Sequence, residues 1–185
     1  KKIKTVNINE IELRRDSLWY FKGSDDLFTG KYNAFFENKK LKESGIIKEG
    51  ILNGKSTKYF INGKKEIEST ILNGKLNGVV KRWYPNGQLA YEIEYRNGKL
   101  NGKSKEWFIN GQVSCEAFFI NEKLHGVSKT YFENGETNGI AYYSNGELDS
   151  LFRFYKNGNK RIRLIRNNGI ENCEEIEWDS LGNIT

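Results

Sequence analysis

The chain has 185 residues, a formal net charge of +6 at pH 7, 37% apolar and 29% charged residues, and no methionine. This apolar content is lean for a thick globular core and favours a thin fold. No run of about eighteen or more apolar residues is present, so the sequence predicts no membrane-spanning helix. Basic and acidic residues are interleaved through most of the chain, which favours solubility over attraction to one charged partner.

The first 29 residues do not share the pattern of the rest of the chain. Apolar residues alternate between residues 6 and 13, and residues 18–21 (LWYF) predict a short buried strand before a turn at residues 23–25. An array of repeats needs an atypical end to cover its first exposed edge. Residues 1–29 are therefore predicted to form an N-terminal cap.

From Gly30 the chain repeats a unit of 24 residues, most clearly in residues 78–101 and 102–125. Each unit places two aromatic residues before an Asn-Gly pair, continues with about eight alternating residues and closes with a second turn. Successive units open at Gly30, Gly54, Gly78, Gly102 and Gly126. The regular spacing identifies a repeat protein.

Turns are predicted at residues 39, 50, 63, 74, 87, 98, 111, 122, 135, 146, 158, 169 and 182. An Asn-Gly pair between alternating apolar residues predicts a hairpin with a two-residue type I′ turn, in which both residues have positive φ. Lys39 and Glu122 replace the expected glycine at two of these turns. We expect an all-β fold, an elongated single-layer antiparallel β-meander of tandem hairpins, with repeats over residues 30–169 and a C-terminal cap over 170–185.

The chain resembles the bacterial variant of the MORN repeat over about residues 18–158. The residues that carry the resemblance are the tract NGKLNG, the 24-residue period and an aromatic doublet before Asn-Gly, which recurs as Trp83-Tyr84, Trp107-Phe108 and Tyr131-Phe132. The resemblance implies a sheet of successive hairpins. Many such bacterial proteins are classed as YwqK-type antitoxins, which implies a neutralising role.

Pairing the strands across two-residue turns also predicts which side chains share a face. Lys81 falls opposite Glu92, and Lys105 falls opposite Glu116. Cross-strand pairs of opposite charge contribute roughly 0.2 to 1 kcal/mol each, and their recurrence supports this register. The other face, which carries Val80, is predicted to be apolar and covered.

A column of aromatic residues, one per repeat, lies on the face of these charged pairs and is predicted to bind a partner. Ala90 and Ser114 are predicted to lie opposite Trp83 and Trp107 and to leave shallow troughs beside the rings. Successive rings lie two strands apart, about 9.6 Å, too far for ring-to-ring contact. An alternative is that the rings only shield backbone hydrogen bonds. The column is Phe35, Tyr59, Trp83, Trp107 and Tyr131, and the predicted partner-binding residues are Tyr59, Lys81, Trp83, Lys105, Trp107, Lys129 and Tyr131.

The sequence offers few parts for catalysis. His125 is the only histidine, and Cys115 and Cys173 are expected to be free thiols about 24 Å apart in the sheet, beyond the ~7 Å limit for a disulfide. A zinc site or a Cys-His nucleophile therefore cannot be assembled from the usual parts. Residues 50–56 and 98–104 look like phosphate loops, but three residues separate their glycines instead of four and a strand follows. We predict no enzyme activity, no cofactor and no metal.

The leading functional hypothesis is a non-enzymatic repeat scaffold that binds a protein partner, in the manner of an antitoxin or immunity protein. An alternative is a surface or envelope module that binds carbohydrate or a host protein through the aromatic troughs. A third is single-strand nucleic-acid binding, against which the interleaved glutamates argue. The chain begins at Lys1 without methionine, so a cytoplasmic location and export after removal of an N-terminal leader are both open.

The repeat predicts that one complete unit can be removed. Deletion of residues 78–101 should leave a folded, shorter protein, because each repeat contacts only its neighbours. Deletion of about twelve residues from within this unit should unfold the protein, since it removes one strand and reverses every strand that follows. Thermal unfolding followed by circular dichroism compares the two deletions. Equal stability would show that the structural unit is not 24 residues long.

Overall fold

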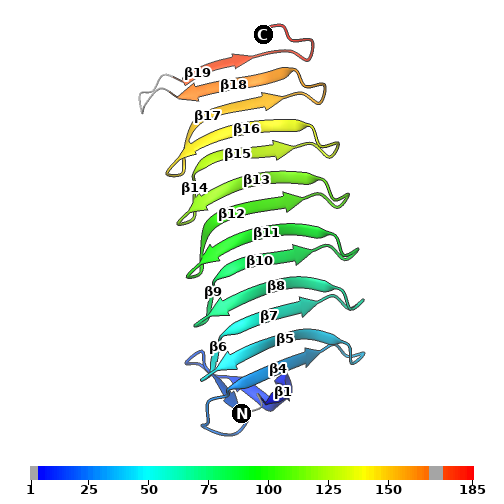
Figure 1. Ribbon diagram of the computed structural model, residues 1–185, viewed down its shortest axis with the longest axis vertical. Helices are drawn as coiled ribbons and strands as arrows, with labels where there is room; N and C mark the ends of the chain where they lie inside the picture. Colours follow the sequence, from blue (N-terminus) through cyan, green and yellow to red (C-terminus); the bar gives the residue numbers. More distant parts are fainter. Residues whose placement is uncertain (1–3, 167–172) are drawn as a thin grey trace. The chain divides into compact units, whose positions relative to one another are not determined.

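The computed structural model describes residues 4–166 and 173–185. It is nearly all β, with 63% of residues in strands and 2% helical. The strands form a mostly antiparallel meander of hairpins (Figure 1), which confirms the predicted fold class. The chain divides into two compact units, one made of Lys1–Gln88 and Tyr95–Gly98 and the other of Leu89–Glu94 and Lys99–Thr185.

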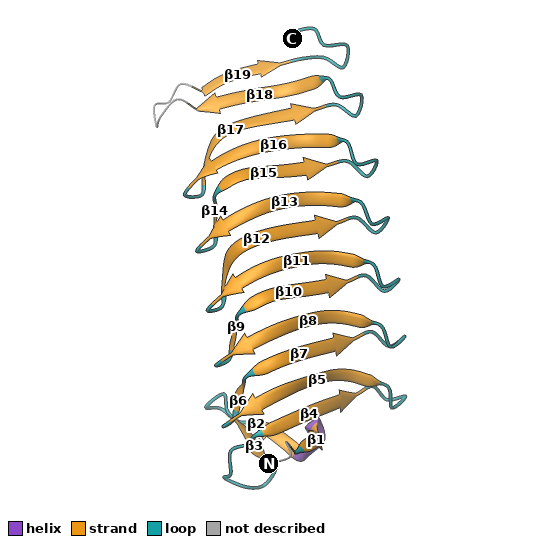
Figure 2. Cartoon of the chain, viewed as in Figure 1, coloured by secondary structure: helices purple, strands orange, loops and turns teal. Residues whose placement is uncertain are grey.

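The first unit is built on the antiparallel strands β4, β5, β7, β8 and β10, and β1 runs parallel to β4. β2 and β3 form a separate pair, and Figure 2 shows the short 3-10 turn η1 beside β1. The bounds are β1 Thr5–Asn7, η1 Ile8–Glu10, β2 Ile11–Leu13, β3 Trp19–Phe21, β4 Gly30–Phe35, β5 Leu41–Lys48, β6 Ile51–Leu52, β7 Gly54–Tyr59, β8 Lys65–Leu72, β9 Lys75–Leu76 and β10 Gly78–Trp83.

In the second unit, β12, β13, β15, β16, β17, β18 and β19 pair antiparallel in chain order. After β19 the chain turns once more, and Trp178 pairs with Ile184. The bounds are β11 Leu89–Arg96, of which Tyr95 and Arg96 belong to the first unit, β12 Lys99–Trp107, β13 Val113–Ile120, β14 Lys123–Leu124, β15 Gly126–Tyr131, β16 Thr137–Ser144, β17 Glu147–Phe154, β18 Lys160–Arg166 and β19 Cys173–Glu177.

Twelve of the thirteen predicted turn positions lie in the described residues, and each has a positive φ there. Lys39 and Glu122, which stand where glycine was expected, have φ values of 63° and 69°. The thirteenth position, residue 169, lies outside the described residues. The spacing of the turns was therefore read correctly from the sequence.

The predicted turn type is right for only one of two alternating kinds of turn. At Asn145-Gly146 both residues have positive φ, 52° and 89°, as a type I′ turn requires. At Asn110-Gly111 only the glycine does, with φ 87°. Gly111 N donates to the carbonyl of Phe108 at 2.9 Å, and Phe108 N donates to Gln112 O at 2.8 Å. This loop has three residues, a type I turn followed by a left-handed glycine.

Among the described residues, the type I′ prediction was wrong at every three-residue turn that contains an Asn-Gly pair. Asparagine is favoured at these turns for another reason: the side chain of Asn110 accepts a hydrogen bond from Gln112 N at 3.0 Å. The affected turns are Asn62-Gly63, Asn86-Gly87, Asn110-Gly111, Asn134-Gly135 and Asn157-Gly158.

The three-residue loop changes the pairing next to the aromatic column. Between Glu106 and Trp107 the register shifts by one residue, so Trp107 pairs with Val113 and the predicted pairing with Ser114 is wrong. The extra residue of this bulge offsets the extra residue of the loop. Beyond the bulge, Lys105 pairs with Glu116 as predicted.

The turns of the three-residue kind are also joined to one another. At three of them the asparagine amide donates a hydrogen bond to a backbone carbonyl of the next turn of the same kind. These bonds are Asn62 to Pro85 O at 3.0 Å, Asn110 to Glu133 O at 2.9 Å and Asn157 to Ser180 O at 2.9 Å. Neighbouring hairpins therefore contact through their turns as well as through their strands.

The sheet of each unit has two unlike faces, because side chains alternate along a strand. We call the side of Tyr59 and Trp83 in the first unit, and of Trp107 and Tyr131 in the second, the aromatic face. The opposite side, which carries Ser56 and Ser69 in the first unit and Ser104 and Ser128 in the second, is the serine face. All the register pairs follow this division.

The serine face is the one that was predicted to be apolar and covered. Val80 is buried there, but much of the row is made of small side chains, and Ser56, Ser69 and Ser104 are buried as well. In the first hairpin the ring of Tyr32 lies so close over Gly45 that an added Cβ would come 2.6 Å from it. Small residues are thus sheltered by larger neighbours on the same face.

Among residues 4–166 and 173–185, a cluster of buried apolar side chains forms where the N-terminal segment packs on the serine face of the first hairpins. The core cluster comprises Val6, Ile11, Phe28, Tyr32 and Ile47. Phe28 and Ile47 have no exposed surface, and burial of each contributes about 1.5 to 3 kcal/mol. Trp19 of β3 stacks on Tyr32, with ring centroids 6.3 Å apart. The N-terminal segment leaves the aromatic face uncovered.

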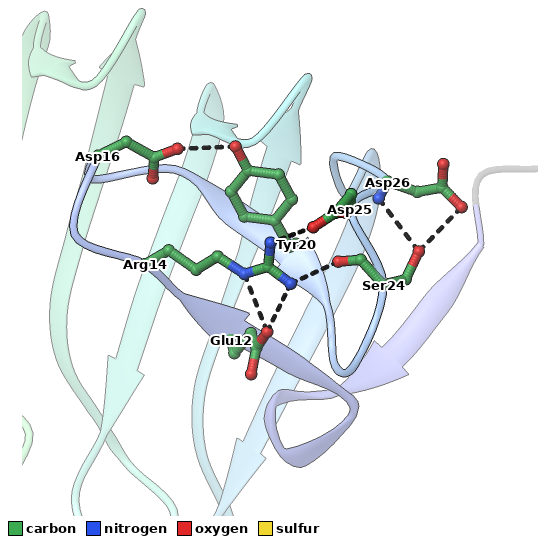
Figure 3. A network of polar contacts seen from close by, with 7 residues as sticks. All are labelled: Glu12, Arg14, Asp16, Tyr20, Ser24, Asp25 and Asp26. Carbon is green, nitrogen blue, oxygen red and sulfur yellow. Dashed lines mark hydrogen bonds and ion pairs between the residues drawn. The ribbon is translucent and has the colours of Figure 1, made fainter.

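A polar network that the sequence did not reveal fastens the loop after β3 to β2 (Figure 3). Arg14 donates to Asp25 Oδ1 at 2.7 Å and to the carbonyl of Ser24 at 2.6 Å. It also pairs with Glu12 at 2.9 Å, and its guanidinium lies 4.3 Å from the ring centre of Tyr20. A planar fork of donors suits this combination of partners, which lysine cannot reproduce.

The turn geometry predicts that glycine at position 122 stabilises the protein. The left-handed conformation costs a residue with a Cβ about 1 to 2 kcal/mol, so Glu122→Gly should raise the free energy of unfolding by about 1 kcal/mol and Tm by about 2 to 4 °C. Glu133→Gly is the matched control, because Glu133 is an exposed turn residue whose φ is not positive. The control should leave Tm unchanged or lower it. Equal effects of both changes in calorimetry would contradict this explanation.

Candidate functional site

All seven residues predicted to bind a partner lie on the aromatic face. Tyr59 ends β7, and Lys81 and Trp83 lie in β10 of the first unit. Lys105 and Trp107 lie in β12, and Lys129 and Tyr131 lie in β15 of the second unit. Alternation along the strands places each lysine beside the aromatic residue two positions later. Their role in binding stays a prediction.

In the second unit, a connected row of polar side chains on this face joins Lys105, Glu116 and Tyr131. Lys105 Nζ lies 2.7 Å from Glu116 Oε1, and the hydroxyl of Tyr131 donates to Glu116 Oε2 at 2.9 Å. Lys129 lies opposite Glu116 in the register. The bond from Lys105, followed by the bond from Tyr131, holds the pKa of Glu116 below its usual range. The predicted Lys105–Glu116 pair is confirmed, and Tyr131 extends it.

The first unit has a similar row centred on Glu68. Lys65 Nζ lies 2.6 Å and Lys55 Nζ 3.0 Å from Glu68 Oε2, and Lys81 is opposite Glu68 in the register. Hydrogen bonding from Lys65 is the largest influence that lowers the pKa of Glu68. Several lysines therefore share one carboxylate on this face.

Trp83 lies in a hollow that the sequence did not predict. The ammonium of Lys65 lies 5.6 Å from the centre of the Trp83 ring, within the range of a cation–π interaction. The hollow has a volume of about 470 Å³ and is lined by Lys64, Lys65, Trp83, Asn86 and Gly87. The walls of this hollow are two lysines and the turn at Asn86-Gly87. The sequence had predicted a trough formed by the small residue Ala90 instead.

The aromatic face also exposes aliphatic and aromatic side chains outside the column, another feature that sequence reasoning missed. The alternation of the strands carries the signal for these residues, because it places them on the same face as the rings. The exposed residues are Ile51 (38%), Leu72 (48%) and Val79 (40%) in the first unit, and Phe118 (38%), Ile120 (40%), Val127 (42%) and Tyr142 (42%) in the second. Apolar side chains gathered on one open face are typical of an interaction surface.

Within residues 4–166 and 173–185, no group of three His, Cys, Asp or Glu residues is placed to hold a metal ion. Burial raises the pKa of the Cys115 thiol, which disfavours a reactive thiolate. The side chain of Cys173 lies outside the described part, so its predicted state is not tested. None of the described helical segments is long and apolar enough to cross a membrane.

The lowered pKa of Glu116 predicts a pH-dependent coupling with Lys105. A carboxylate with a depressed folded pKa contributes stability above its usual pKa of about 4.3, and this contribution is lost as pH falls through the folded value. In a cycle of Lys105→Gln, Glu116→Gln and the double variant, the coupling at pH 7 should be roughly 0.2 to 1 kcal/mol, as expected for a partly exposed pair. In urea unfolding it should decline as the pH falls below about 4.3 and vanish once the pH lies below the depressed folded pKa. Persistence of the coupling in acid would show that packing, and not charge, joins the two residues.

Comparison with known proteins gives one positive result. The family model of the MORN repeat variant matches residues 76–97 and 124–145. No curated protein matches the chain significantly. MORN repeats are commonly protein-interaction or membrane-binding modules, and the family is not a known enzyme family. The two matches, each spanning a hairpin of the meander, support a MORN-repeat protein.

Proposed function

We propose that this protein is a non-enzymatic repeat scaffold that binds a protein partner through its aromatic face. The observation that carries the proposal is the group of exposed apolar side chains on the same face as Trp83 in the first unit and Trp107 in the second. Residues that anchor protein interfaces are typically Trp, Tyr and Arg surrounded by such side chains.

The serine face is a poorer candidate for the same role. In the first unit its charged residues pair with one another, since Lys58 lies 3.9 Å from Glu43 and Arg82 lies 3.9 Å from Glu66. The N-terminal segment also packs on this face through the core cluster around Tyr32 and Ile47. In the first unit, the N-terminal segment does not cover the aromatic face. The lysines on that face also outnumber its carboxylates, so its charges are not balanced in pairs.

The resemblance to YwqK-type antitoxins favours a partner that the scaffold neutralises, as an antitoxin or immunity protein does. Carbohydrate or nucleic-acid binding would use the open faces of the rings for stacking. The ammonium of Lys65 over Trp83, and that of Lys105 at 5.6 Å from the centre of Trp107, occupy such positions. These contacts favour a protein partner over both alternatives.

Replacement of Trp83 and Trp107 by alanine tests the proposal. Interface anchors cost about 2 kcal/mol or more on truncation, so each change should weaken binding of a copurified partner by about thirtyfold. The rings are partly exposed, and Tm should therefore move by no more than about 4 °C. Calorimetric titration and thermal unfolding measure the two effects. Loss of folding without a specific loss of binding would make the column structural and contradict the proposal.

A photo-crosslinking residue locates the contact independently of affinity. Val79 and Arg82 lie on the same strand, β10, but on opposite faces. A benzoylphenylalanine placed at Val79 should crosslink to the partner, and the same group at Arg82, the matched control, should not. Crosslinking from Arg82 alone would assign binding to the serine face.

A further inference from the structure

We infer that the aromatic face of the first unit binds an acidic polypeptide segment in which carboxylates and apolar side chains are mixed. The inference rests on the proposed function and adds the chemistry of the partner. Its basis is an excess of lysine on this face, together with the aliphatic side chains that lie between the lysines.

Charge is divided unevenly between the two units. The first unit contains 19 Lys and Arg against 10 Asp and Glu, a formal charge of +9, and the second contains 11 against 14, a charge of −3. The two values add to the +6 of the whole chain. The modest net charge therefore conceals a strongly basic first unit.

Within the first unit, more than half of this excess lies on the aromatic face. Alternation and register place six lysines there, and Glu68 is the one carboxylate of β4, β5, β7, β8 and β10 on that side. The lysines are Lys31, Lys48, Lys55, Lys65, Lys75 and Lys81, of which the first five are exposed. Clustered charge of one sign attracts a partner of the opposite sign and raises the rate of encounter.

Aliphatic side chains alternate with these lysines at the tight turns. Lys48 lies opposite Ile51 across one turn, and Leu72 lies opposite Lys75 across the next. Gly74 of the second turn lies close above Ile51, because a Cβ there would come 3.4 Å from its methyl group. Successive turns therefore present a charged and an apolar group together.

This combination favours a polypeptide over other anionic partners. A nucleic-acid strand offers phosphates and bases, and a base that stacks on the face of Trp83 occupied by Lys65 would have to displace the ammonium. Phosphates also make no favourable apolar contact with the exposed side chains of Ile51, Leu72 and Val79. A peptide with glutamates beside leucines or valines matches both kinds of group.

Binding of a fluorescein-labelled peptide of mixed glutamate and leucine to the full chain tests the inference by fluorescence anisotropy. Lys31→Gln, Lys48→Gln and Lys75→Gln combined should weaken binding at least about tenfold and flatten its dependence on salt. Lys22→Gln, Lys39→Gln and Lys40→Gln combined are the matched control, with the same change in net charge outside the aromatic face. The control should weaken binding less than about threefold. If the first triple variant fails to fold, Lys48→Gln alone should still weaken binding more than Lys40→Gln alone.

Three results would overturn the inference: an equal loss in both triple variants, no binding of the peptide at low salt, or tighter binding of oligothymidylate or phosphatidylserine vesicles than of the peptide. Failure here is distinguishable from failure of the proposed function. A partner that crosslinks from Val79 but is insensitive to the lysine changes would leave the scaffold in place and remove only its acidic specificity.

Discussion

Strand register is the constraint on which the other features of this sheet depend. A slip of one residue would exchange the aromatic and serine faces along a whole strand. Each three-residue loop has one residue more than a two-residue turn, which by itself would shift the strand pairing by one residue. The bulge beside Trp107 reverses that shift, so the pairing beyond it is restored. The Asn110 side chain holds the loop through its bond to Gln112 N. Both the lysine rows and the aromatic column are therefore consequences of the turn geometry.

Little of the stability of the repeats comes from deep burial. The core around Phe28 and Ile47 belongs to the N-terminal segment and the first hairpins, whereas the later repeats bury small side chains such as Ser104 and Ala141. Cross-strand pairs and backbone hydrogen bonds between neighbours must supply the rest. Such a sheet can leave one face open to solvent without losing its fold, which is what a binding surface requires.

Much of this fold follows from patterns visible in the sequence, and the exceptions have physical reasons. The positions of the turns and the pair Lys105–Glu116 were predicted because a 24-residue period fixes spacing. The turn type at Asn110-Gly111 was missed, since asparagine serves both left-handed turns and side-chain caps. The contacts of Arg14 with Asp25, and of Lys65 with Trp83, depend on side-chain reach across the structure, which no periodicity encodes.

The asparagine bonds between successive turns have a consequence for how such a chain can change. Asn62 and Asn110 each bind the backbone of the next turn, at Pro85 and Glu133, and not its side chain. A carbonyl is supplied by every amino acid, so the residue at that position is free to differ, and it is proline in one repeat and glutamate in another. Adjacent hairpins remain joined while their exposed side chains diverge. Copies of the 24-residue repeat can thereby acquire different surface charges, basic in the first unit and more acidic in the second, while the backbone of the hairpins stays the same.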